Sequence, residues 1–321
     1  MEKQSLTIIA AFMIVIMLVN SAFAFYTDRK IRKITNDIQS TRIQLQEKDK
    51  QIKQLNDAVT EKDKQINFQK DEIHKLNKLL QSKRGKWAEA LAMRGRITGP
   101  KIAYLTFDDG PGPHTYQILQ VLKEHGINAS FFVVGAKAEE QPDLVRAQFQ
   151  AGHAVLPHTY SHKYSEIYAS KDAFLNDLHR VEHTITSILG FAVPKIFRFP
   201  GGVTNAVASR AVMTGIVKQL HGEGYIYADW NASAADTAIG RNKDTELGNI
   251  LNASQDKNEV VILCHDIQPD THTLDMLGEL IKTMKARGFI FKTFRDISDE
   301  EIYRLSAVGT INLNLEKLLG N

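Results

Sequence analysis

The 321-residue sequence contains a single cysteine, Cys264, so no disulfide bond can form within the chain. No proline precedes Pro100 and no glycine precedes Gly85, so the residues that most often interrupt helices are missing from the first quarter of the sequence. No charged residue lies between Gln4 and Thr27. The chain is therefore expected to begin as one long helix with an uncharged stretch from Gln4 to Thr27, and to fold by packing or around a metal ion.

The composition is that of a protein with a sizeable core, because 43% of the residues are hydrophobic and 24% are charged. Its length predicts one large or two unequal units. Residues 1–99 hold 19 of the 40 lysines and arginines and 11 of the 37 acidic residues, a net charge of +8, which leaves −5 for residues 100–321. Phosphate binding needs a basic face, so this charge balance argues against nucleic acid as a partner of the larger part.

Residues 1–27 have two interpretations. The apolar run Leu6–Leu18 is enough to cross the core of a bilayer as a helix, which predicts a single-pass membrane anchor. The stretch Ala22–Ala24 resembles a signal-peptidase site, and cleavage after Ala24 would release a secreted protein. More positive charge follows the span than precedes it, so the positive-inside rule conflicts with an extracytoplasmic location for the rest of the chain. The chemistry below favours that location.

Residues 28–85 are expected to form a helical, coiled-coil-like stalk, followed by a linker over residues 86–100. Apolar residues recur every seven positions, at Ile31, Ile38, Leu45, Ile52, Val59, Ile66, Ile73 and Leu80. The companion positions are apolar in fewer than half of the cases. The stretch beginning at Glu47 is repeated at Glu61, which indicates growth by duplication. Pairing with a second copy, pairing with a partner helix and a single helix all remain open.

After Pro100 short apolar runs alternate with amphipathic stretches, which predicts an α/β fold around a parallel sheet. We expect this α/β domain over residues 101–297 and a helical tail over residues 298–321. Helices are predicted at, for example, Ala173–Leu189 and Thr271–Arg287. The seven predicted strands are Ile102–Phe107, Ala129–Val134, His153–Leu156, Lys195–Phe199, Tyr225–Tyr227, Glu259–Leu263 and Phe289–Phe294.

Aspartates and histidines, residues that can bind a metal ion, follow several of these strands. They lie at the sheet edge where α/β proteins bind their ligands. The first strand runs into Asp108 and Asp109, and the third into His158 and His162. Two histidines four apart, taken as one helical turn, can share a metal ion with a carboxylate from another strand end. The neighbouring carboxylate can then serve as a general base.

A second pair, His179 and His183, has the same spacing but falls inside a long amphipathic stretch, so we interpret it as a solvated helix face.

Five motifs in order resemble those of the polysaccharide deacetylase family, also called the NodB-homology domain or carbohydrate esterase family 4. They extend over about residues 101–297. They are Thr106–Gly110, His158–His162, Arg198–Gly202, Trp230–Asp236 and Leu263–His265. The resemblance implies a distorted (β/α)7 barrel that hydrolyses the N-acetyl amide of N-acetylglucosamine in a polysaccharide, most naturally peptidoglycan. A chitooligosaccharide or exopolysaccharide substrate, and a non-catalytic glycan-binding tether, are the alternatives.

The same resemblance implies roles for individual residues. Asp108 would be the catalytic base and Arg198 its partner, while His265 would be the general acid tuned by Asp236. The remaining assignments are Asp109, His158 and His162 as ligands of a divalent metal (Zn²⁺, or Co²⁺ or another transition metal), and Gly201, Trp230 and Leu263 as substrate-binding residues.

Two departures from the family pattern stand out. Gly201 replaces the tyrosine of many relatives. The backbone N–H at this position is still available as a donor, but the aromatic side chain that would pack against the sugar is missing. The aspartate motif is also spread out, with Asp229 before Trp230 and Asp236 after it, so Asp229 is a second candidate for the partner of His265.

Overall fold

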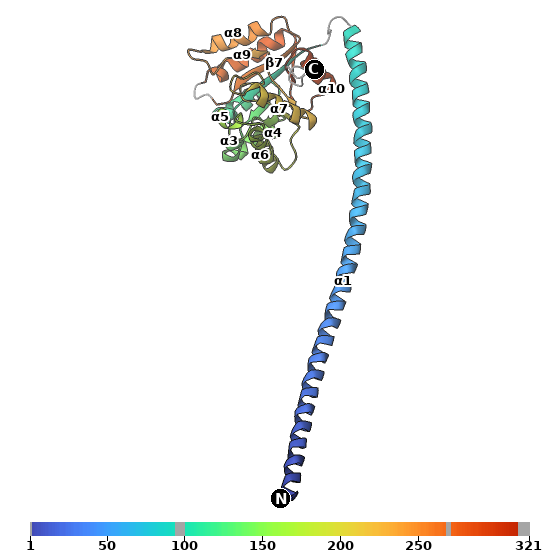
Figure 1. Cartoon of the computed structure of the whole chain (residues 1–321). Helices are drawn as coiled ribbons and strands as arrows, with labels where there is room; N and C mark the ends of the chain where they lie inside the picture. The colour runs from blue at the N-terminus through green and yellow to red at the C-terminus, as the bar shows by residue number, and fades with distance from the viewer. Residues whose placement is uncertain (1, 94–99, 268–270, 314–321) are drawn as a thin grey trace. The chain divides into compact units, whose positions relative to one another are not determined.

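The computed structural model describes residues 2–93, 100–267 and 271–313. The chain divides into two compact units, residues 1–90 and residues 91–321. The first is essentially one helix and the second is an α/β domain (Figure 1).

The first unit is helix α1 (Glu2–Met93), 92 residues long. It continues through Gly85 to Met93, so the linker expected from residue 86 begins later than predicted, and residues 94–99 of it lie outside the described residues. One glycine costs only about 1 kcal/mol in a helix, and the residues after it are good helix formers. The stretch Phe12–Lys70 contains a window apolar enough to cross a membrane, although a signal sequence passes the same test.

The second unit is built on a parallel sheet of six strands. Their order is β3–β2–β1–β7–β6, and β8 also pairs with β1. The strands are β1 (Lys101–Asp108), β2 (Ser130–Val133), β3 (Ala154–Pro157), β6 (Ala232–Ser233), β7 (Glu259–His265) and β8 (Phe289–Lys292). Asp108 is in register with Phe132 on one side and His265 on the other, so the polar ends of the central strands meet at one edge.

Two short strands, β4 (Ile196–Phe197) and β5 (Ile226–Tyr227), form a separate parallel pair. A backbone hydrogen bond of 3.2 Å from Arg198 to the carbonyl of Pro157 ties the end of β4 to the end of β3. All seven predicted strands are present, but the count of seven is wrong because β6 adds an eighth. A two-residue strand inside a polar motif has no apolar run by which it could be recognised.

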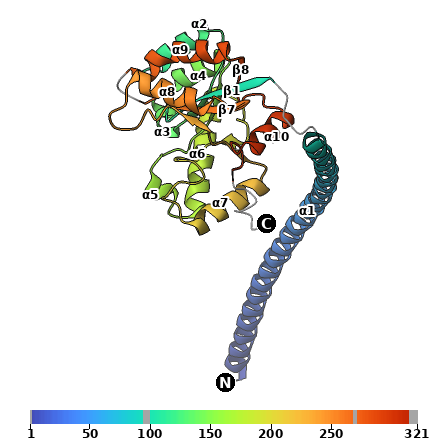
Figure 2. The ribbon, with the colours of Figure 1, turned by 90° about the horizontal axis from the view of Figure 1, so that it is seen from above.

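Helices surround the sheet, and α8 and α9 lie side by side on it (Figure 2). The helices are α2 (Thr115–Glu124), α3 (Gly135–Glu140), α4 (Pro142–Gln150), α5 (Tyr164–Ile167), α6 (Lys171–Leu189), α7 (Arg210–Gly222), α8 (Lys243–Ala253), α9 (His272–Ala286) and α10 (Asp299–Ala307). Local sequence sets their ends: Ser170 caps α6 at its start, and Gly190, in the left-handed region at φ 84°, ends it.

The tail predicted after residue 297 belongs to the second unit. A capping box between Ser298 and Glu301 starts α10, and Leu305 of this helix is completely buried. Beyond it, Ile311 forms an antiparallel bridge with Ala228 and is also buried. Packing of apolar residues therefore extends the domain past the expected boundary; residues 314–321 lie outside the described residues.

Candidate metal centre and active site

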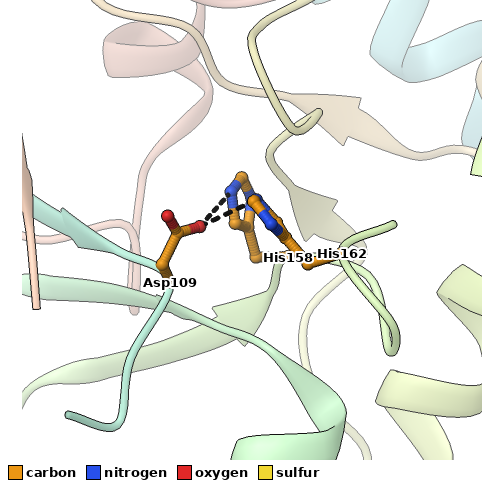
Figure 3. Close-up of side chains that lie close together, drawn as sticks. All are labelled: Asp109, His158 and His162. Atoms are coloured by element: carbon orange, nitrogen blue, oxygen red, sulfur yellow. Dashed lines mark ion pairs between the residues drawn. The ribbon is translucent and has the colours of Figure 1, made fainter. Parts of the chain in front are cut away.

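Three potential ligands converge at the carboxyl ends of β1 and β3. Asp109 directly follows β1, His158 directly follows β3, and His162 comes from the loop after it; their side chains point toward one another (Figure 3). Oδ1 of Asp109 lies 3.2 Å from Nε2 of His158 and 2.9 Å from Nε2 of His162. Ligand atoms bonded to one tetrahedral ion at about 2.0–2.1 Å are about 3.3 Å apart, so the spacing suits a shared cation.

The chemistry of these donors supports the same conclusion. Nδ1 of His158 is 2.9 Å from the carbonyl oxygen of Arg198, which can only accept, so Nδ1 carries the proton and Nε2 presents its lone pair to the site. Oδ1 of Asp109 is buried and has no hydrogen-bond partner among the described residues. A buried carboxylate oxygen that faces two imidazole nitrogens and has no hydrogen-bond donor among the described residues fits a metal ligand.

The backbone around these ligands is strained. Asp109, Thr159 and His162 have φ values of 68°, 69° and 55°, in the left-handed region that residues with a side chain rarely adopt. The expectation that the two histidines share a helical turn is wrong, because they lie in an irregular loop. Asp177 of α6 holds this loop by accepting hydrogen bonds from the backbone of Tyr160 (2.5 Å) and Ser161 (3.0 Å). Strain held in place by surrounding bonds is typical of functional sites.

Asp108 is fixed by a completely buried arginine. Nη1 of Arg198 donates to Oδ1 of Asp108 at 2.7 Å and to the hydroxyl of Thr106 at 2.7 Å. Nε donates to the carbonyl of Ala228 at 2.8 Å, and the guanidinium lies 4.2 Å from the ring centre of Phe132. The other oxygen, Oδ2 of Asp108, is 3.7 Å from Nε2 of His158. One carboxylate oxygen is thus tied to the arginine while the other faces the ligand cluster.

His265, at the end of β7, pairs with Asp236. Nδ1 of His265 is 2.7 Å from Oδ1 of Asp236, whose Oδ2 accepts from the His265 backbone N–H at 2.6 Å. Burial lowers the pKa of His265, but Asp236, helped by the charges of Asp108 and Asp109, outweighs burial and raises that pKa to about 9. The imidazole is therefore held in its protonated form beside the cluster.

Asp229, the other candidate partner of His265, has a different position. Its Oδ1 accepts from the backbone N–H of Val203 at 3.2 Å, and its Oδ2 is buried without a hydrogen-bond partner among the described residues. Burial raises the pKa of this carboxyl to about 6. Asp229 thus braces the turn at Gly201 and Gly202, and Asp236 is the residue paired with His265.

The three predicted substrate-binding residues are spread around the site. Gly201 is exposed and has a φ of 73°, Trp230 is half-buried beside Gly202, and Leu263 is buried in β7. His179 and His183 are four residues apart, like His158 and His162. Both are exposed on α6, as predicted for a solvated helix face.

Sequence reasoning missed Tyr164. Atoms of its ring and hydroxyl lie 3.1–3.2 Å from where a side chain on Gly201 would begin, and its ring centre is 5.3 Å from that of His162. Burial, with the charges of Asp109 and Asp108, raises the pKa of this phenol to about 12, so it stays neutral. An aromatic ring thus stands where Gly201 leaves room. The tyrosine two residues after His162 was the available signal.

Comparison with known proteins agrees with this geometry. Residues 95–216 match the polysaccharide deacetylase family. A peptidoglycan-N-acetylglucosamine deacetylase of Bacillus cereus is 29% identical over 202 residues, which cover 62% of this chain and 71% of that protein. The chitin deacetylase of Colletotrichum lindemuthianum is 32% identical over 204 residues, which cover 60% and 78% of the two chains.

A solved structure with the same fold is the catalytic domain of the peptidoglycan N-acetylglucosamine deacetylase from Eubacterium rectale. It superimposes with a TM-score of 0.58 at 32% identity, over 64% of this chain and 92% of that one. Sequence similarity, fold and the position of the acidic and histidine residues at the strand ends lead to one conclusion: the chain belongs to the polysaccharide deacetylase family.

Proposed function

We propose that this enzyme removes the acetyl group from N-acetylglucosamine residues of peptidoglycan. The observation that carries the proposal is the close approach of Asp109, His158 and His162 beside a carboxylate, Asp108, that Arg198 holds in place. The relatives named for peptidoglycan favour this substrate. The chitin deacetylase relative favours chitooligosaccharides as the second candidate.

Asp109, His158 and His162 would hold one divalent cation, and two imidazoles with one carboxylate suit Zn²⁺ best, with Co²⁺ or another transition metal as alternatives. Such an ion, when bound, polarises the acetyl carbonyl and makes water more acidic. The donor set leaves open positions for water and substrate. We also infer that the β4–β5 pair and the larger sheet form one distorted barrel, supported by the bond from Arg198 to Pro157.

The contacts of the protein residues support a proposed catalytic role for each of them. Oδ2 of Asp108 accepts the proton of the attacking water, while the Arg198 guanidinium, bonded to Oδ1, holds the carboxylate in position. The backbone N–H of Gly201 donates to the oxyanion. His265, kept protonated by Asp236, donates its proton to the departing amine. Tyr164 and Trp230 flank Gly201 and Gly202 as the walls against the sugar.

We further propose that residues 1–27 anchor the chain in the membrane and that α1 lifts an extracytoplasmic catalytic domain toward the wall. The length and apolarity of α1 support this, and secretion after cleavage at Ala24 is the alternative. The heptad residues Ile31, Ile38, Leu45, Ile52, Val59, Ile66 and Ile73 are exposed on the single helix, so a second copy or a partner helix can cover them. Sedimentation of the chain without residues 1–27 tests self-association, and a Leu45→Asp, Ile52→Asp variant should be monomeric.

Acetate release tests the proposed function. Purified chain is incubated with peptidoglycan and, separately, with chitooligosaccharides, with added Zn²⁺ or with a chelator. We expect release from peptidoglycan that the chelator abolishes and that His162→Ala reduces at least 100-fold, whereas His183→Ala, the exposed control, keeps the parental rate. Absence of release from every N-acetylated glycan by metal-loaded protein would refute deacetylation and leave the non-catalytic tether.

A further inference from the structure

A buried chain of polar groups adjoins the His265–Asp236 pair. The hydroxyl of Thr273, in the first turn of α9, is 3.2 Å from Oδ2 of Asp236. The same hydroxyl is 3.2 Å from Oε2 of Glu246 on α8. Asp236 and Glu246 are completely buried and Thr273 nearly so. One hydroxyl group, that of Thr273, therefore links two buried carboxylates from different parts of the fold.

A threonine hydroxyl has one proton to donate. If both carboxylates are ionised, only one of them receives that proton, and the other faces an oxygen lone pair. If Glu246 carries a proton, it can donate to Oγ1 of Thr273, and the threonine proton is then free for Asp236. The proton on Glu246 thus decides where the threonine hydroxyl points.

Other charged or titratable groups of the described residues lie near Glu246. Nε of Arg241, in the loop before α8, lies 3.3 Å from Oε1 of Glu246, and Nδ1 of His272 lies 4.0 Å from it. Lys243 forms its own exposed pair with Glu279 of α9. Burial raises the pKa of Glu246, and the charge of Asp236 raises it further, against the opposing effects of Thr273, Arg241 and His272. The buried, uncharged thiol of Cys264 is the neighbour on β7.

We propose that Thr273 and Glu246 are positioning residues of the general acid: Thr273 holds Asp236 against His265, and Glu246 directs the Thr273 hydroxyl. This proposal rests on the proposed function, in which His265 protonates the leaving amine. Neither residue touches the ligand cluster, so both act through Asp236. Groups that hold a directly acting side chain in place by hydrogen bonds, as is known for the residues behind metal ligands, commonly contribute 10–100-fold to activity.

The first arm of the test is kinetic, on full-length chain in detergent loaded with Zn²⁺. Thr273→Val removes the hydroxyl at nearly constant volume, and we expect kcat to fall about tenfold with KM changed less than about twofold. Thr273→Ser should restore kcat to within about threefold of the parent. The matched control is Thr184→Val, which removes another nearly buried helix hydroxyl, bonded to Glu139 of α3. Equal kcat in Thr273→Val and Thr184→Val would overturn the proposal.

The second arm does not depend on activity. The pKa of His265 is measured by NMR in metal-free full-length chain with labelled histidines, and its signal is identified by its loss in His265→Gln. With Glu246 ionised, its carboxylate competes with Asp236 for the single proton of the Thr273 hydroxyl. Glu246→Gln ends this competition, because the amide donates to Oγ1 of Thr273 and leaves the threonine proton to Asp236, so we expect the pKa of His265 to fall. Asp244→Asn makes the same charge change on an exposed part of α8 and should leave it unchanged. The shift should shrink to less than half in the Thr273→Val background, because the coupling runs through the hydroxyl.

The two arms separate the possible failures. If the parent releases no acetate but Glu246→Gln shifts His265 through Thr273, the proposed function is wrong and the buried network stands. If the parent is active while Glu246→Gln leaves the pKa of His265 at the parental value, or shifts it equally with and without the Thr273 hydroxyl, the positioning role is refuted.

Discussion

Replacing Asp236 by asparagine tests how this site keeps an imidazole protonated. The pKa of His265 is raised from 6.5 to about 9 against the lowering effect of burial, and the contact with Asp236 at 2.7 Å is the largest opposing cause. The difference between 6.5 and about 9 corresponds to about 3 kcal/mol between the two protonation states. Asparagine keeps the shape and an acceptor for Nδ1–H but not the charge, so burial should take the pKa to 6.5 or below.

The populations at pH 7.5 follow from these values. A pKa of about 9 leaves about 97% of His265 protonated, whereas a pKa of 6.5 leaves about 9%. We therefore expect kcat for acetate release at pH 7.5 to fall at least about tenfold in Asp236→Asn, with partial recovery at lower pH. NMR titration of metal-free protein measures the pKa directly, and Asp229→Asn, which alters the other aspartate of the motif, should leave His265 above 8. A pKa that stays above 8 in Asp236→Asn would show that Asp236 does not hold the proton.

The remaining predictions concern stability, the base and the metal. In metal-free protein the raised pKa of His265 stabilises the fold fully below pH 6.5, and this contribution should disappear as the pH rises through 9, which thermal melts at several pH values will show. Because burial raises the pKa of Asp229 to about 6, its ionisation destabilises the fold as the pH rises from 3.8 to 6, so Asp229→Asn should gain about 1–3 kcal/mol in urea unfolding at pH 7.5. Arg198→Met breaks a fully buried pair and should cost about 3–5 kcal/mol of unfolding free energy and abolish acetate release. Calorimetric titration with Zn²⁺ should show at least about 100-fold weaker binding by His162→Ala, with His183→Ala unchanged.

The sequence was sufficient wherever a property depends on neighbours along the chain. The lack of glycine and proline predicted the long helix α1, and alternating apolar runs predicted the parallel sheet and seven of the eight strands found in the described residues. The order of the strands also implied that Asp109 and His158 would meet, because carboxyl ends of parallel strands share one edge. The contrast between His158–His162 and His179–His183 followed from the strand that ends before one pair and the helix that contains the other.

Only the tertiary structure decided relations between residues far apart in the chain. The family resemblance favoured Asp236 as the partner of His265 and left Asp229, seven positions earlier, as the second candidate. The fold places Asp236 2.7 Å from the imidazole and directs Asp229 toward Val203. Tyr164 became part of the site because the turn at Gly201 comes back against it. Burial sets the pKa of each acid and base, and burial is a property of the packed domain that no local pattern encodes. Local sequence therefore identifies the candidate acids, bases and metal ligands, while packing determines their partners and charges.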